Sequence, residues 1–280
     1  MQKIDSVPAM RTLAATYKRQ GTLVALVPTN GALQVAHRAL IAAARERGAV
    51  VVVGIFANPL AFGPSENFAR YPRTPEADEA MCAEEKVDIL FRPTAEEMYP
   101  KGFSTYVTEE AVSRPLCGVS RPTHFRGVTT GITKLLNIVQ PDLLVLGQRD
   151  PQQVAVVRKM IGDLCLGAEV VVVPVVREGD GLAVSVKNQD LTPRQREDAL
   201  AIHAALVRAQ EMVAQGVRST DRVIAEATHH LGERRMIRVI YIATVDPVTM
   251  EPMREIVPGR TLLAIAVWVD QVRLIDNVEL

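Results

Sequence analysis

The stretch LVALVPTNGALQVAHRAL, residues 23–40, decides the fold of this chain. Its apolar start ends at the turn PTNG (28–31), and apolar residues then recur at helical spacing, which predicts a strand, a turn and a helix. A second apolar run, VVVVGIF at 50–56, predicts the next strand. Together they form a β-α-β unit whose two strands are parallel and buried on both faces.

The turn inside this unit is the first candidate binding site. Open α/β sheets bind ligands beyond the carboxyl ends of their strands, beside helix N-termini whose free N–H groups attract phosphate. We therefore expect Asn30, Gly31, Gln34 and His37 to lie at such a site.

Working outward, the pattern predicts an α/β fold with a doubly wound parallel sheet and a smaller α+β domain with an antiparallel sheet, entered near residue 180. A helix at 7–19 precedes the first predicted strand. The first domain adds helices at 75–86, 128–139 and 152–163 and strands at 87–91, 143–146 and 169–176. The second has helices at 193–215 and 219–231 and strands at 237–245, 262–269 and 272–275, after a polar loop at 180–191.

Composition narrows the class of partner. The 280 residues contain 32 Lys+Arg and 32 Asp+Glu, which favours a small-molecule substrate over nucleic acid or an anionic membrane. Three cysteines without C-x-x-C spacing indicate a reducing compartment. The sequence shows neither an apolar leader nor a run long enough for a membrane span, so we expect a cytoplasmic protein.

Polar residues gather at four predicted strand ends, at 29–37, 58–62, 147–153 and 176–188. Turns are polar in any fold, so each cluster alone carries little information, but four on one rim of one sheet predict a pocket. The second cluster belongs to a long loop at 57–73. Arg149 and Lys187 would offset the charge of a triphosphate or of leaving pyrophosphate.

Three aspartates leave two interpretations open. Asp78, Asp150 and Asp180 could hold Mg²⁺ or contact a ribose, or they could cap helices and turns. His124 in a loop is likewise either structural or functional. The motifs of serine hydrolases, P-loop kinases and simple dehydrogenases do not stand out.

A series of segments resembles the pantothenate synthetase family, the pantoate–β-alanine ligases of the HIGH-type nucleotidylyltransferase superfamily. They occur in the family's order over nearly the whole chain: VPTNGAL (27–33), FANPLAFGP (56–64), YPRTPEAD (71–78), EEMYPKGF (96–103), SRPTHFRGV (120–128), TKLLNIVQPD (133–142), VREGDGLA (176–183) and VDPVTMEP (245–252). The resemblance implies a Rossmann-like domain (1–180) for ATP and an acid, a smaller lid domain (181–280), and a homodimer.

The resemblance also assigns roles. It implies catalytic roles for His37, Gln34, Arg149 and Lys187. It implies ATP binding by Thr29, Gly31, His37, Gly147, Arg149, Asp150, Val176, Val184, Ser185 and Lys187, and binding of the acid by Asn30, Asn58, Ala61 and Gln153. Of the three aspartates named above, Asp78 is the candidate for binding Mg²⁺.

The chain departs from the family where the chemistry occurs. Gln34 replaces the first of two motif histidines, and Asn30 replaces a methionine beside pantoate. Ala61 replaces a glutamine that holds pantoate, which removes a hydrogen bond worth about 1–3 kcal/mol. Arg149 replaces a lysine, and Ser185-Val186-Lys187-Asn188 replaces S-S-R-N.

Three functions follow. The first is an AMP-forming ligase that activates a hydroxy acid as an acyl-adenylate and transfers it to an amine such as β-alanine, with pantoate or an altered acid. The second is a paralogue that keeps the fold and binds nucleotide as a scaffold or regulator. The third is transfer of AMP to a phosphate ester.

Overall fold

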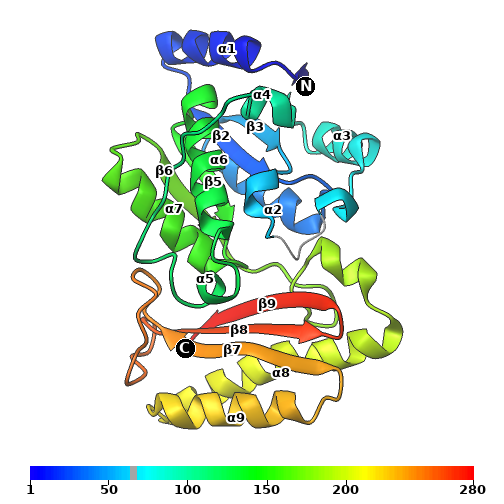
Figure 1. Cartoon of the computed structure of the whole chain (residues 1–280), viewed down its shortest axis with the longest axis vertical. Coiled ribbons are helices and arrows are strands. Elements are labelled where there is room, and N and C mark those ends of the chain that lie inside the picture. The colour runs from blue at the N-terminus through cyan, green and yellow to red at the C-terminus, as the bar shows by residue number, and fades with distance from the viewer. Residues whose placement is uncertain (64–67) are drawn as a thin grey trace.

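Two sheets organise the chain in the computed structural model, which describes residues 1–63 and 68–280 (Figure 1). Within those residues the first sheet has six parallel strands in the order β1-β4-β3-β2-β5-β6. Their bounds are β1 Gln2–Ile4, β2 Val24–Thr29, β3 Val50–Ile55, β4 Ile89–Phe91, β5 Leu143–Gly147 and β6 Glu169–Val173. The chain winds outward in opposite directions from β2, so a crevice is expected between the ends of β2 and β5.

Helices cover both faces of this sheet. One face packs against α1 (Val7–Gln20), α6 (His124–Val139) and α7 (Pro151–Asp163), and the other against α2 (Val35–Glu46) and α3 (Pro75–Glu84). Strand β2 shows why helices cover both faces. Val24 and Leu26 belong to the core with α1, α6 and α7, while Ala25 and Val27 belong to the core with α2 and α3. Side chains alternate along a strand, so a continuous apolar run is buried on both sides.

The second sheet is antiparallel, in the order β7-β8-β9. Its strands are β7 Ile237–Val245, β8 Leu262–Val269 and β9 Val272–Glu279, and its helices are α8 Pro193–Ala214 and α9 Thr220–Gly232. Strand β8 is buried on both faces: Leu263 and Ile265 pack into the core with α8 and α9, and Leu262 and Ala264 pack toward the core of the first sheet. The second sheet therefore lies between its own helices and the large sheet's helices (Figure 1).

Short helices occupy the loops. They are η1 Pro59–Ala61, η2 Phe68–Arg70, α4 Ala95–Met98, α5 Cys117–Ser120 and η3 Val186–Asp190. In the described part of the chain no helix has the length and apolar character that a membrane span requires.

The fold class is confirmed, and several boundaries are corrected. Strand β1 was not predicted, because three residues are too few to show a strand's alternation of side chains. They form a strand by pairing with β4. The predicted strand 169–176 ends at Val173, because Pro174 lacks the N–H that a ladder needs. Strand β9 continues to Glu279 beyond the predicted 275, and α6 begins at His124 instead of 128.

Two segments predicted as loops contain short helices that were not predicted. The predicted loop 180–191 contains η3. The predicted loop 57–73 contains η1 and η2, while residues 64–67 of it lie outside the described part of the chain.

Candidate active site

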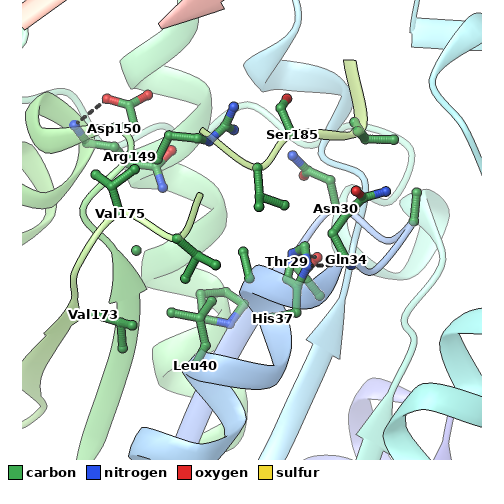
Figure 2. A pocket seen from close by; sticks show the side chains of 18 of the residues that line it. Thr29, Asn30, Gln34, His37, Leu40, Arg149, Asp150, Val173, Val175 and Ser185 are labelled. Carbon is green, nitrogen blue, oxygen red and sulfur yellow. Dashed lines mark hydrogen bonds between the residues drawn. The ribbon is translucent and has the colours of Figure 1, made fainter. Parts of the chain in front are cut away.

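A cavity of about 230 Å³ lies at the carboxyl ends of β2, β5 and β6 (Figure 2). We call it the nucleotide cavity, after the ligand that the resemblance leads us to expect there. Twelve predicted site residues line it: Thr29, Asn30, Gly31, Gln34, His37, Gly147, Arg149, Asp150, Gln153, Val176, Val184 and Ser185. Residues far apart in the sequence meet here because the strands are parallel and end on the same rim.

The turn after β2 forms one wall and has a strained backbone. Gly31 has φ of 86° and Ala32 has φ of 51°, both in the left-handed region. A Cβ on Gly31 would lie 3.2 Å from the Asp78 carboxylate, so glycine fits best. Buried Asp78 accepts the backbone N–H groups of Ala32 (2.9 Å) and Leu33 (2.7 Å). The carboxylate therefore fixes the turn in place.

His37, in the first turn of α2, has a defined hydrogen-bonding state. The backbone N–H of Gln34 donates to His37 Nδ1 (2.9 Å), and His37 Nε2 lies 3.2 Å from Thr29 Oγ1. Nδ1 therefore carries no proton, and Nε2–H donates to the threonine hydroxyl. Burial lowers the pKa of His37 below its ordinary value of 6.5, so the ring is neutral at pH 7.

Arg149 brings positive charge to the opposite wall (Figure 2). It follows β5, and the next residue, Asp150, is the N-cap of α7, where its side chain accepts the N–H of Gln153 (3.0 Å). Burial lowers the pKa of Arg149, yet a guanidinium stays charged in proteins. A half-buried cation of this kind suits phosphate oxygens.

Tyr71 also lines the nucleotide cavity, although no role for it is predicted from the sequence. Its hydroxyl makes a side-chain hydrogen bond with Asn30, and burial raises its pKa. Tyr71 belongs to the YPRTPEAD segment, but only the folded chain brings this loop against the turn after β2.

A second cavity of about 110 Å³ adjoins the first, and we call it the acid cavity. All four residues predicted to bind the acid line it: Asn30, Asn58, Ala61 and Gln153. The remainder is largely apolar, from Phe56 and the α6 residues Val128, Ile132 and Leu135. Thr29, Asn30 and Gln153 line both cavities, so ligands in the two would meet beside these three residues.

Asn58 and His124 shape the acid cavity through fixed contacts. Asn58 Nδ2 donates to the carbonyl of Gly127 (2.7 Å), and Asn58 Oδ1 accepts the hydroxyl of Tyr99 (3.0 Å). His124 Nδ1 lies 2.7 Å from the carbonyl oxygen of Ala61. These bonds tie the 3₁₀ turn carrying Ala61 to α6, which forms the cavity's floor.

Three residues singled out in the sequence, Lys187, Asp78 and Asp180, are not among the described residues that line either cavity. Lys187 is in η3. Asp78 lines a neighbouring cavity, and it also accepts the hydroxyl of Thr74 (2.9 Å), so that hydroxyl does not cap α3. Asp180 pairs with Arg196 at 2.6 Å. Over residues 1–63 and 68–280, His, Cys, Asp and Glu form no cluster of three that could hold a metal ion.

The open parallel sheet, with a cationic cavity at its switch point, defines the class of Rossmann-like nucleotide-binding enzymes. A family described as Pantoate-beta-alanine ligase matches residues 2–279. The chain belongs to this family.

Relatives agree over the full length. A pantothenate synthetase from Moorella thermoacetica is 45% identical over 280 residues, covering 100% of this chain and 99% of the relative. The crystal structure of pantothenate synthetase from Thermus thermophilus has a TM-score of 0.92 at 39% identity and covers 100% and 99% of the two chains. The Francisella tularensis ligase, described as complexed with beta-gamma ATP and beta-alanine, has a TM-score of 0.82 at 28% identity, covering 100% and 97%.

Proposed function

We propose that this protein joins pantoate to β-alanine in an ATP-dependent reaction that releases AMP and pyrophosphate. The observation that carries this proposal is the junction of the two cavities at Thr29, Asn30 and Gln153. An acid in the smaller cavity would present its carboxylate there to the α-phosphate of ATP in the larger one.

In the first step a carboxylate oxygen attacks the α-phosphorus, and the bond to pyrophosphate breaks, giving an acyl-adenylate. Arg149 would stabilise the charge that builds on the phosphates, together with the N-terminus of α2. In the second step the amine nitrogen attacks the acyl carbon, AMP leaves, and the amine loses a proton. Proximity of the reactants supplies much of the catalysis, and a covalent enzyme intermediate is not required.

Neutral His37 fits this scheme as a hydrogen-bonding group. By donating to Thr29, it fixes the threonine oxygen, which also accepts the N–H of Gly31 (3.1 Å). The hydroxyl proton of Thr29 then remains to be donated to a ligand at the cavity junction. Gln34, which replaces a motif histidine, lines the same wall and offers an amide donor.

Magnesium enters this scheme with the nucleotide. Mg²⁺ is usually bound through phosphate oxygens and water with few protein carboxylates, and the Asp78 carboxylate is occupied by two N–H groups and a hydroxyl. Because these contacts already use the Asp78 carboxylate, it fits direct Mg²⁺ binding poorly. Its predicted role as a Mg²⁺ ligand stays a prediction.

The organisation around the site is part of the proposal. Residues 1–180 would bind ATP and the acid, and residues 181–280 would cover the site as a lid that excludes water from the adenylate. The separate core of α8, α9 and the second sheet supports this division. We further propose that the protein forms a homodimer, as the family resemblance implies, and that it is cytoplasmic, as the cysteine pattern indicates.

The test measures AMP and pyrophosphate release with ATP, Mg²⁺, β-alanine and either pantoate or a panel of other short hydroxy acids, with mass spectrometry of the products. Pantothenate is the expected product. AMP release with another acid alone would mean that Asn30 and Ala61 have changed the substrate. Nucleotide binding without AMP release from any acid would establish a scaffold, and an adenylylated phosphate ester would establish a transferase.

A further inference from the structure

Strand β9, near the C-terminus, carries two adjacent buried polar residues, Asp276 and Asn277, that contact loops beside the nucleotide cavity. Asp276 is 3% exposed and Asn277 is 2% exposed. Buried polar groups reduce stability unless they are hydrogen-bonded, so their partners indicate what they hold.

Asn277 holds the loop after β5. Its Nδ2 donates to the carbonyl oxygens of Gln148 (2.9 Å) and Arg149 (3.2 Å). Both amide hydrogens of one side chain are thus used on two consecutive peptide groups. The backbone of the residue that brings positive charge to the cavity is therefore fixed by the second sheet.

Asp276 holds the opposite wall. Its carboxylate forms a two-pronged ion pair with Arg177, at 2.6 and 3.0 Å, and Arg177 also donates to the carbonyl of Gly181 (3.1 Å). Arg177 lies next to Val176, and it pairs with Ala183 across a hairpin whose second arm leads to Ser185. A paired carboxylate at the base of this hairpin fixes the arm that lines the cavity.

The contacts made by Asp276 and those made by Asn277 lie close together. Arg149, Ser185 and Asp276 line the same small cavity beneath the nucleotide cavity, and the backbone N–H of Asn277 donates to Asp276 Oδ1 (2.8 Å). A shift of β9 would therefore move both walls, because one is tied to Asn277 and the other to the adjacent Asp276.

We propose that Asp276 and Asn277 are positioning residues that set the distance between the Arg149 loop and the Ser185 hairpin for nucleotide binding. The inference rests on the proposed function, because it assigns the nucleotide to the cavity between these walls. It adds that the C-terminal strand is a structural part of the ATP site, although neither residue lines the nucleotide cavity itself.

The test is the affinity of the full chain for α,β-methylene-ATP with Mg²⁺, measured by calorimetry. Asn277→Ala removes both hydrogen bonds to the Arg149 loop and should weaken binding about tenfold or more, while the KM for pantoate changes less than threefold. In an Arg149→Met background the same substitution should change the Kd less than threefold, because the group it positions has gone. If Asn277→Ala raises the Kd by the same factor in the wild-type and Arg149→Met backgrounds, the proposal is overturned.

A matched control separates positioning from general stability. Thr261 is also a buried polar residue of the second domain, but among the described residues its side chain bonds to Val257 of the same domain. Thr261→Val should lower the melting temperature and leave the Kd within twofold. If Asn277→Ala does not fold, Asn277→Ser keeps one donor and should show a smaller loss; an unchanged Kd there would also overturn the proposal.

The two proposals fail in different ways. If the wild-type chain does not bind the nucleotide analogue and forms no product, the proposed function fails. If the wild-type chain binds and turns over but Asn277→Ala matches it, only the role of β9 fails.

Discussion

The two adjoining cavities are built in different ways. Loops from three strand ends surround the nucleotide cavity, and long-range polar contacts hold them, such as Asp78 on the turn after β2 and Asn277 on the loop after β5. The acid cavity is formed mainly by the apolar face of α6 and the turn carrying Ala61. Its described lining residues include no Lys, Arg, Asp or Glu.

This difference implies a division of labour. Under the proposed function, charge and hydrogen bonding would position the nucleotide, whereas shape and a few amides would select the acid. Substitutions in the two cavities should therefore separate in their kinetics, and the following predictions test that separation.

The largest effect should come from Arg149→Met. In the proposed function Arg149 faces the phosphates of ATP. Removing its charge should lower kcat for AMP formation about a hundredfold or more, as does the loss of a group that stabilises transition-state charge in other enzymes. The KM for pantoate should change little. Arg149→Lys keeps the charge and should retain activity within about tenfold of wild type. Steady-state assays that vary each substrate check this, and equal losses for the two variants would contradict it.

Asp78→Asn should affect both cavities, because the turn that it anchors lines both. Each carboxylate oxygen of Asp78 accepts one N–H group, whereas an amide has a single oxygen and its nitrogen cannot accept. One hydrogen bond is therefore lost, which should lower the free energy of unfolding by about 1–3 kcal/mol. Urea unfolding measures this loss. The Mg²⁺ concentration for half-maximal activity should stay the same; a large increase would restore the metal-binding interpretation of Asp78.

Ala61→Gln should act on the acid cavity alone. A glutamine would add an amide to a wall that now presents a methyl group, and it should lower the KM for pantoate about tenfold. The KM for ATP is the internal control and should stay within twofold. A higher KM for pantoate would mean that the cavity is shaped for a different acid.

The smallest effect should be the pH dependence of stability due to His37. Its pKa is lowered by burial, so between the folded and unfolded values the unfolded chain binds more protons. The stabilising contribution is complete above about pH 6.5 and is lost as the pH falls through the folded-state pKa. Melting temperatures at pH 8 and pH 5 should therefore differ more in wild type than in His37→Gln. Parallel curves would contradict a buried neutral His37.

Prediction succeeded where local pattern and burial agree. Uninterrupted apolar runs such as 50–56 gave the parallel strands, and parallel strands place their ends on one rim, which brought residues such as His37 and Arg149 to one cavity. It failed for β1, which becomes a strand only by pairing. Asp78 left two interpretations open, because a carboxylate near a turn looks the same whether it binds metal or N–H groups.

The sequence by itself determined the order of elements, the parallel sheet and the positions of the polar clusters, because these follow from periodicity and residue type within short windows. Only the tertiary structure decided that two cavities join at Asn30, that Tyr71 contacts it, and that Asn277 supports Arg149 from 128 residues away. Contacts over such separations depend on how packed layers place backbone groups, and no local pattern encodes that geometry.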